Sequence, residues 1–171
     1  TAHIEGEMPL GYCNFLGQKS GIVYLAEGAL KPILAAILHN IEVIGSPSAG
    51  WAGSPRLFRE FLESVDASVI RLLPDAGMLD EPHRNVHAQY RRVVMLLRDW
   101  GYQVEVGWWG QSQKANPDCD ELRSPEWQRV NWITWETYDD LHTQECGDDW
   151  LTKKRNFERK KWLERHRYSA D

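Results

Sequence analysis

The stretch IVYLAEGALKP, residues 22–32, determines how the rest of the chain is interpreted. Its first residues, four apolar side chains leading to Ala26, have the length and the β-branched content of a buried strand. Glu27 and Gly28 follow, and a new apolar run then predicts a helix over residues 30–39, with Pro32 tolerated in the first turn. A buried strand that ends in a carboxylate suggests that the carboxylate has a chemical task.

The same alternation of strand and helix continues downstream. The apolar patterns predict strands over residues 22–26, 41–44, 68–73 and 103–108, and helices over residues 30–39, 57–65 and 86–100. Gly101 is the expected C-cap of the third helix. Such β-α-β alternation with short connections predicts an α/β fold: a mostly parallel four-stranded sheet with right-handed crossovers and helices on both faces.

The pattern changes on either side of this region. We expect an irregular entry segment over residues 1–20, an α/β domain over residues 21–123, and a Trp-rich and basic helical extension over residues 124–171. The chain starts with Thr1 rather than Met, and we expect it to be part of a longer polypeptide. No internal repeat is evident.

Composition narrows the class of protein. Of 171 residues, 42% are hydrophobic, yet no run of 18 apolar residues and no secretory signal are present, which favours a cytoplasmic globular domain. Three cysteines, far apart and odd in number, indicate a reducing compartment and argue against a structural zinc site.

Charge is distributed unevenly along the chain. The net charge is −5, but residues 152–168 hold eight Lys or Arg and two Glu, so the remainder is strongly acidic. An acidic body with a basic end meets nucleic acid where metal ions or the basic end neutralise phosphates. Candidate nucleic-acid-binding residues are Lys114, Lys153, Lys154 and Arg155; a solvated charged helix is the ordinary reading of the basic end.

Carboxylates follow three of the predicted strands. Glu27 ends the first, Asp75 follows the third, and Asp118 and Asp120 lie in the loop after the fourth. Because the carboxyl ends of parallel strands meet at one edge, these four side chains are candidates to hold Mg²⁺, with Mn²⁺ as a substitute. Such a metal would polarise a phosphoryl oxygen while Glu27 moves a proton. The ordinary alternative is solvated surface acids.

Four motifs carry a resemblance to a known family: AEGALKP (26–32), LLPDAG (72–77), GWWGQ (107–111) and PDCDEL (117–122). Over residues 22–122 the chain resembles the Toprim domain of primases, topoisomerases and small nucleases. It is most similar to the uncharacterised Toprim-like domain in large replication proteins of bacterial plasmids and phages, especially cyanobacterial ones.

The resemblance implies roles for individual residues. Glu27 would be the acid/base residue, Asp75 the first metal-binding aspartate, and Asp118 and Asp120 the later acidic pair. It implies Mg²⁺-dependent phosphoryl transfer on DNA or RNA, primer synthesis first and strand cleavage second. The implied partners are nucleic acid and flanking domains of a longer polypeptide, such as a helicase.

Two residues depart from the primase pattern. Lys31 stands where primases often have an acid, and it would act in catalysis by contacting a phosphate, or pair with Glu27 one helical turn away. Gly77 stands where the second Asp of D-x-D belongs, and Asp80 would replace it only in part. These departures favour an alternative, a degenerate module that binds DNA or a partner domain without catalysis. A structural spacer is the third option.

Other features have both a functional and an ordinary reading. The loop GSPSAGWAGSP (45–55) would cradle a phosphate at a helix N-terminus, or form a turn with Ser54 as N-cap. His83 and His87 would share a metal or be surface residues. Trp51, Trp108 and Trp109 would stack on bases or pack in the core.

Overall fold

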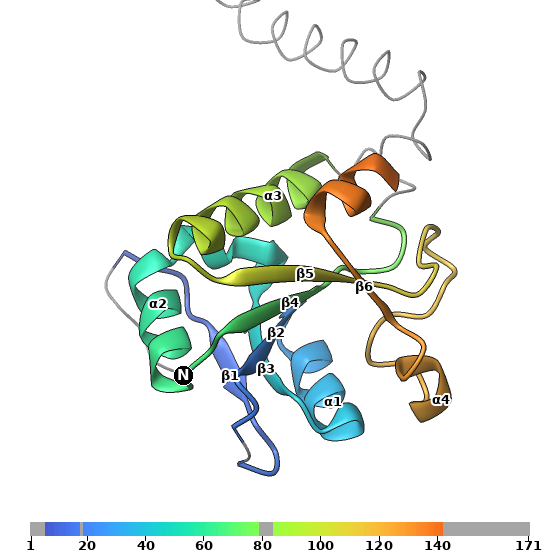
Figure 1. Cartoon of the computed structure of the whole chain (residues 1–171), viewed down its shortest axis with the longest axis horizontal. Coiled ribbons are helices and arrows are strands. Elements are labelled where there is room, and N and C mark those ends of the chain that lie inside the picture. The colour runs from blue at the N-terminus through green and yellow to red at the C-terminus, as the bar shows by residue number, and fades with distance from the viewer. Residues whose placement is uncertain (1–5, 18, 79–83, 142–171) are drawn as a thin grey trace, which may run out of the picture.

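A computed structural model of the chain describes residues 6–17, 19–78 and 84–141. These residues form a six-stranded sheet in the order β1-β3-β2-β4-β5-β6 (Figure 1). The strands are β1 (Gly11–Cys13), β2 (Ile22–Glu27), β3 (Glu42–Ser46), β4 (Val69–Leu73), β5 (Gln103–Trp108) and β6 (Asn131–Ile133). The helices are α1 (Leu30–His39), the 3₁₀ segment η1 (Pro47–Gly53), α2 (Pro55–Ser64), α3 (Arg84–Asp99) and α4 (Ser124–Trp127), with a further helical turn over residues 135–141.

The predicted α/β architecture is confirmed, with one correction. The four inner strands β3, β2, β4 and β5 run parallel, as predicted, but β1 and β6 add antiparallel edges, so the sheet has six strands. Each edge strand has only three residues, too short to show a period-2 pattern. The segment over residues 11–13, expected to be irregular, therefore belongs to the sheet.

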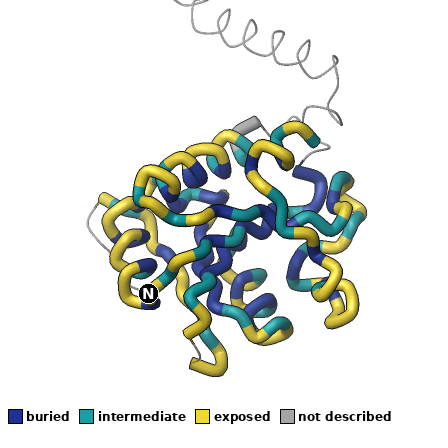
Figure 2. The backbone as a smooth tube through the Cα atoms, in the orientation of Figure 1, coloured by how far each residue is buried: buried dark blue, intermediate teal, exposed yellow. Residues whose placement is uncertain are grey.

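Helices cover both faces of the sheet (Figure 1). Alternate side chains of β2 point to opposite faces: Val23 and Leu25 belong to the larger core beneath α2 and α3, and Tyr24 and Ala26 to a smaller core beneath α1. Figure 2 shows these buried positions concentrated along the central strands. Among the described residues, no helix is long and apolar enough to cross a membrane.

The Gly/Ser/Pro-rich loop is ordered rather than a phosphate cradle. It forms η1, and Trp51 at its centre is fully buried and donates a hydrogen bond from Nε1 to the Ile44 carbonyl (3.1 Å). Ser54 is the N-cap residue of α2 and Pro55 begins the helix, as expected, but the Ser54 hydroxyl makes no capping hydrogen bond and donates to the Met8 carbonyl. The Glu7 carboxylate instead accepts from the first backbone N–H groups of α2, at 3.1 and 3.0 Å, and occupies the place a phosphate would take.

Helix α1 lies where the spacing predicts, but its large aliphatic residues face outward. Its buried residues are Pro32, Ala35 and Ala36, whereas the exposed ones are Leu30, Ile33, Ile37 and Leu38. The small inward residues let the helix approach β3 closely: a Cβ on Gly45 would lie 2.7 Å from the Pro32 ring. Close packing also brings the side chain of Lys31 to the carboxyl ends of the strands.

Candidate active site

Two strands deliver carboxylates to the same edge of the sheet. Strands β2 and β4 are parallel neighbours, and Ala26 pairs with Leu73, so Glu27 and Asp75 lie just beyond the last pair of the two strands. Both side chains line one cavity of about 240 Å³, together with Ala76, Gly77, Met78, Val86 and Lys114. The sheet edge predicted to hold the site therefore contains a cavity, and both acidic and basic side chains line it.

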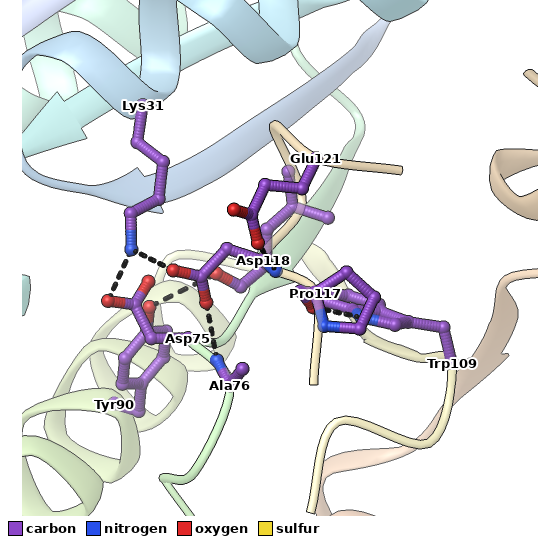
Figure 3. A network of polar contacts seen from close by, with 9 residues as sticks. Lys31, Asp75, Ala76, Tyr90, Trp109, Pro117, Asp118 and Glu121 are labelled. Carbon is purple, nitrogen blue, oxygen red and sulfur yellow. Dashed lines mark hydrogen bonds and ion pairs between the residues drawn. The ribbon is translucent and has the colours of Figure 1, made fainter. Parts of the chain in front are cut away.

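Lys31 joins the ends of two further segments (Figure 3). Its ammonium lies 2.6 Å from Asp75 Oδ2 and 2.9 Å from Asp118 Oδ2. The three side chains are between 18% and 21% exposed, so the ion pairs are largely shielded from water. The predicted pairing of Lys31 with Glu27 is wrong, since both ion pairs of the ammonium go to aspartates.

Asp118 is fixed by its surroundings. Its Oδ1 accepts a hydrogen bond from the Ala76 backbone N–H (2.6 Å), and its own backbone N–H donates to Glu121 Oε2 (2.9 Å). One residue earlier, the Pro117 carbonyl accepts from Trp109 Nε1 at 2.9 Å (Figure 3). The loop after β5 is thus tied to the turn after β4, which brings Asp118 next to Asp75.

Gly77 has a steric reason to be glycine. Its φ is +79°, and a Cβ there would lie 2.7 Å from the Lys114 backbone nitrogen and 2.8 Å from the Lys114 Cα. Its N–H donates to the Gln111 carbonyl at 3.2 Å. No side chain fits where the resembled motif has its second aspartate, and the loop that fills the space presents Lys114 to the cavity.

Burial and neighbouring charges at this edge favour the protonated form of the carboxyl groups of Glu27 and Asp75. Burial, and then the charge of Asp75, raises the pKa of Glu27, and Lys31 and Lys114 offset this only in part. Burial likewise raises the pKa of Asp75 despite its hydrogen bond and ion pair with Lys31. For Lys31 itself burial favours the neutral amine, but Asp75 and Asp118 outweigh burial and raise the pKa. Both cavity carboxyls therefore ionise less readily than usual.

The raised pKa of Glu27 predicts a pH-dependent stability difference. A folded state that holds this proton more tightly than the unfolded chain loses stability as pH rises through the folded pKa. In EDTA, Glu27→Gln is therefore expected to melt higher than wild type at pH 8, and the gap should narrow as pH falls towards the ordinary glutamate pKa of about 4.3. Melting curves of both proteins between pH 8 and pH 5 measure this. A gap that widens on acidification would contradict it.

The carboxylates at this edge fit a divalent metal ion only if water or substrate supplies most of its ligands. Within the described residues, no group of three or more His, Cys, Asp or Glu side chains is placed to hold a metal ion. Mg²⁺, however, needs only one or two carboxylates when waters and substrate phosphates complete its shell. Glu27 and Asp75 line the same cavity, and Asp75 Oδ1 is buried with no hydrogen-bond partner in the described structure. The donors fit a largely hydrated Mg²⁺ and not a cage of four acids.

Other predicted residues take different positions. Asp120 does not line the cavity and forms no ion pair with Lys31. Burial raises its pKa, and its buried Oδ1 has no hydrogen-bond partner among the described residues. His87 pairs with Asp139 at 2.9 Å. Five candidates lie outside the described residues: Asp80, His83, Lys153, Lys154 and Arg155.

The tryptophans named as possible base platforms are engaged in packing. Trp51 is a core residue, so that reading of it is wrong. Trp108 packs edge-on against Tyr138, with ring centroids 6.2 Å apart. Trp109 is half-buried, and its indole N–H is bonded to the Pro117 carbonyl.

His39 and Trp127 were missed by sequence reasoning. His39, at the last turn of α1, donates from Nε2 to the Cys119 carbonyl (2.9 Å), and its ring stacks on Trp127 with centroids 4.0 Å apart. Helix α1 thus contacts the loop after β5 at two consecutive residues: Lys31 binds Asp118, and His39 binds Cys119. A single histidine at a helix end carries no sequence signal for such a contact.

Fold and site together define an α/β protein with a charged cavity at the carboxyl edge of a mostly parallel sheet. Comparisons of the chain with protein-family models, with curated proteins and with solved structures found no match.

Proposed function

We propose that the chain is a Toprim-like domain of a DNA replication or DNA-processing protein, and that it catalyses Mg²⁺-dependent phosphoryl transfer on nucleic acid. Primer synthesis is the first reaction to test, and strand cleavage is the second. One observation carries the proposal: Glu27 and Asp75, from the ends of adjacent parallel strands, line a single cavity together with Lys114.

The chain's own residues would divide the work. Glu27, whose pKa is raised by burial and by Asp75, is suited to accept or give a proton at the attacking or leaving oxygen. Lys114 reaches the cavity from the loop after β5 and would bind a substrate phosphate. Glu27 and Asp75 would hold Mg²⁺, which supplies charge stabilisation at a phosphoryl oxygen.

Metal-dependent stability tests the proposal. Wild-type protein, stripped with EDTA, should melt at a higher temperature when Mg²⁺ or Mn²⁺ is added. At one hundred times the dissociation constant a bound ligand adds about 2.7 kcal/mol, which is several degrees for a chain of this size. Glu27→Gln and Asp75→Asn should abolish the shift, because each removes one of two carboxylate ligands.

The control is Glu60→Gln, which removes an exposed carboxylate on α2 and should keep the full metal shift. Turnover is then measured on single-stranded templates with nucleotides, on primed templates and on nicked DNA. If wild type shows neither a metal shift nor turnover on any substrate, the phosphoryl-transfer proposal fails.

A degenerate module is the second candidate, and the Lys31 bridge favours it. An ammonium between Asp75 and Asp118, and a glycine in place of the second aspartate, leave fewer free carboxylates for metals. In that case DNA affinity should depend on salt, survive Glu27→Gln and come with no turnover. Such a module would bind either DNA or a partner domain.

A further inference from the structure

The ammonium of Lys31 stands where two carboxylates converge. It is 2.6 Å from Asp75 Oδ2 and 2.9 Å from Asp118 Oδ2, and it contacts the same type of atom on each aspartate. Two aspartates contacting one small cation also describes the inner shell of a divalent metal. In this structure the ammonium of an internal lysine occupies that position instead.

Asp118 is held more firmly than the lysine, and so is the backbone next to Asp75. Asp118 is fixed on both sides, by the Ala76 N–H on its Oδ1 and by Glu121 on its backbone N–H. Asp75 directly precedes Ala76, so the same hydrogen bond links the two aspartates through the backbone. Lys31 reaches them along a flexible four-carbon stem. The lysine is therefore the part of the cluster that can move.

We infer that Lys31 is an internal counter-ion that competes with divalent metal for Asp75, the carboxylate shared by the Lys31 ion pairs and the cavity, so that the site fills only when the ammonium withdraws from Asp75. This deepens the proposed function and rests on it. Lys31 then sets the concentration of free Mg²⁺ at which the cavity becomes loaded.

Simple electrostatics supports competition rather than cooperation. A divalent ion bound by Asp75 would lie close to the ammonium, and like charges at such a separation repel strongly in a site that is partly shielded from water. Lys114 is not in the same position, because it makes no ion pair within the described structure and acts on Glu27 and Asp75 only through its charge. Lys31 is the cation that must leave.

Metal binding by charge-matched variants tests the inference. Mn²⁺ binding to the whole chain is followed by electron paramagnetic resonance at pH 8 and fixed ionic strength. Lys31→Met should bind Mn²⁺ at least about tenfold more tightly than wild type, within the usual range for coupling between two sites. Lys31→Gln, which keeps a hydrogen-bond donor, should change affinity in the same direction.

The matched control is Lys19→Met. Lys19 donates to the Ser64 carbonyl, away from the cavity, so this variant loses one positive charge without touching the aspartates. Its affinity should equal that of wild type. A gain shared by both variants would mean that net charge alone is responsible, and would overturn the inference.

A second measurement uses wild-type protein and does not depend on the variants folding. Acetic anhydride acylates free amines, and mass spectrometry reports the extent at each lysine. Lys31 should be protected without metal and acylated faster with Mg²⁺, whereas Lys19 should be unaffected. If metal binds but Lys31 stays protected, and Lys31→Met binds no more tightly, the inference falls while the proposed function stands. If no protein binds metal, both fall.

Discussion

Gly77→Ala is expected to lower the free energy of unfolding by about 3 kcal/mol. The residue has φ +79°, which costs a non-glycine residue about 1–2 kcal/mol, and a Cβ would press on the Lys114 backbone at 2.7 Å, an overpacking that adds about 1–3 kcal/mol. Relief requires the loop before Asp118 to shift. Urea denaturation followed by circular dichroism measures the loss.

Gly101→Ala separates strain from collision. Gly101 has φ +87°, but nothing lies within 4 Å of its Cβ position, so this variant should lose only the conformational cost of about 1–2 kcal/mol. The difference between the two variants measures the contact with Lys114. If both lose the same amount, the loop does not press on Gly77 in solution.

Trp51→Ala is expected to cost about 3–5 kcal/mol, the range for removing a fully buried large aromatic side chain. The indole packs edge-on against Tyr90 with ring centroids 5.6 Å apart, and its removal also leaves the Ile44 carbonyl without its hydrogen bond. Trp51→Phe keeps most of the volume and should lose less. The same denaturation experiment measures both.

Met95→Ala serves as the control, because Met95 is 59% exposed on α3 and its truncation should change stability by less than about 0.5 kcal/mol. The tryptophan variants also decide between core and base platform. A Trp51→Ala protein with normal stability but weakened DNA binding would contradict the packing role described above.

Most of the parallel sheet was predictable because its strands are long and bounded by clear signals. The bounds of α1 and β5 match the predicted ranges, and Gly101 has the left-handed φ expected of a helix C-cap. The edge strands escaped prediction since three residues carry no period. The outward face of α1 escaped too, because spacing predicts a helix but not which side the sheet will accept.

Most residues of the candidate site were predictable from the sequence, but the ion pairs that join them were not. Glu27 and Asp75 follow buried strands, and the topology of parallel sheets brings such positions together. Lys31 and Asp118 are 87 residues apart, and their contact depends on how an irregular loop folds back over the sheet edge. Nothing in local sequence encodes that return. Gly77 looked like a lost ligand, and only the position of Lys114 shows why no side chain fits.

The contact between Gly77 and Lys114 also restricts how this sequence can change over generations. A lone mutation from glycine to aspartate would place a strained and colliding residue in the turn, so selection for a stable fold would remove it before a second carboxylate could prove useful. The loop over residues 111–117 would have to retreat first, through changes that bring no benefit by themselves. In this turn the sequence therefore keeps Asp75 as its one aspartate, because the backbone at Lys114 leaves no space for a side chain at position 77.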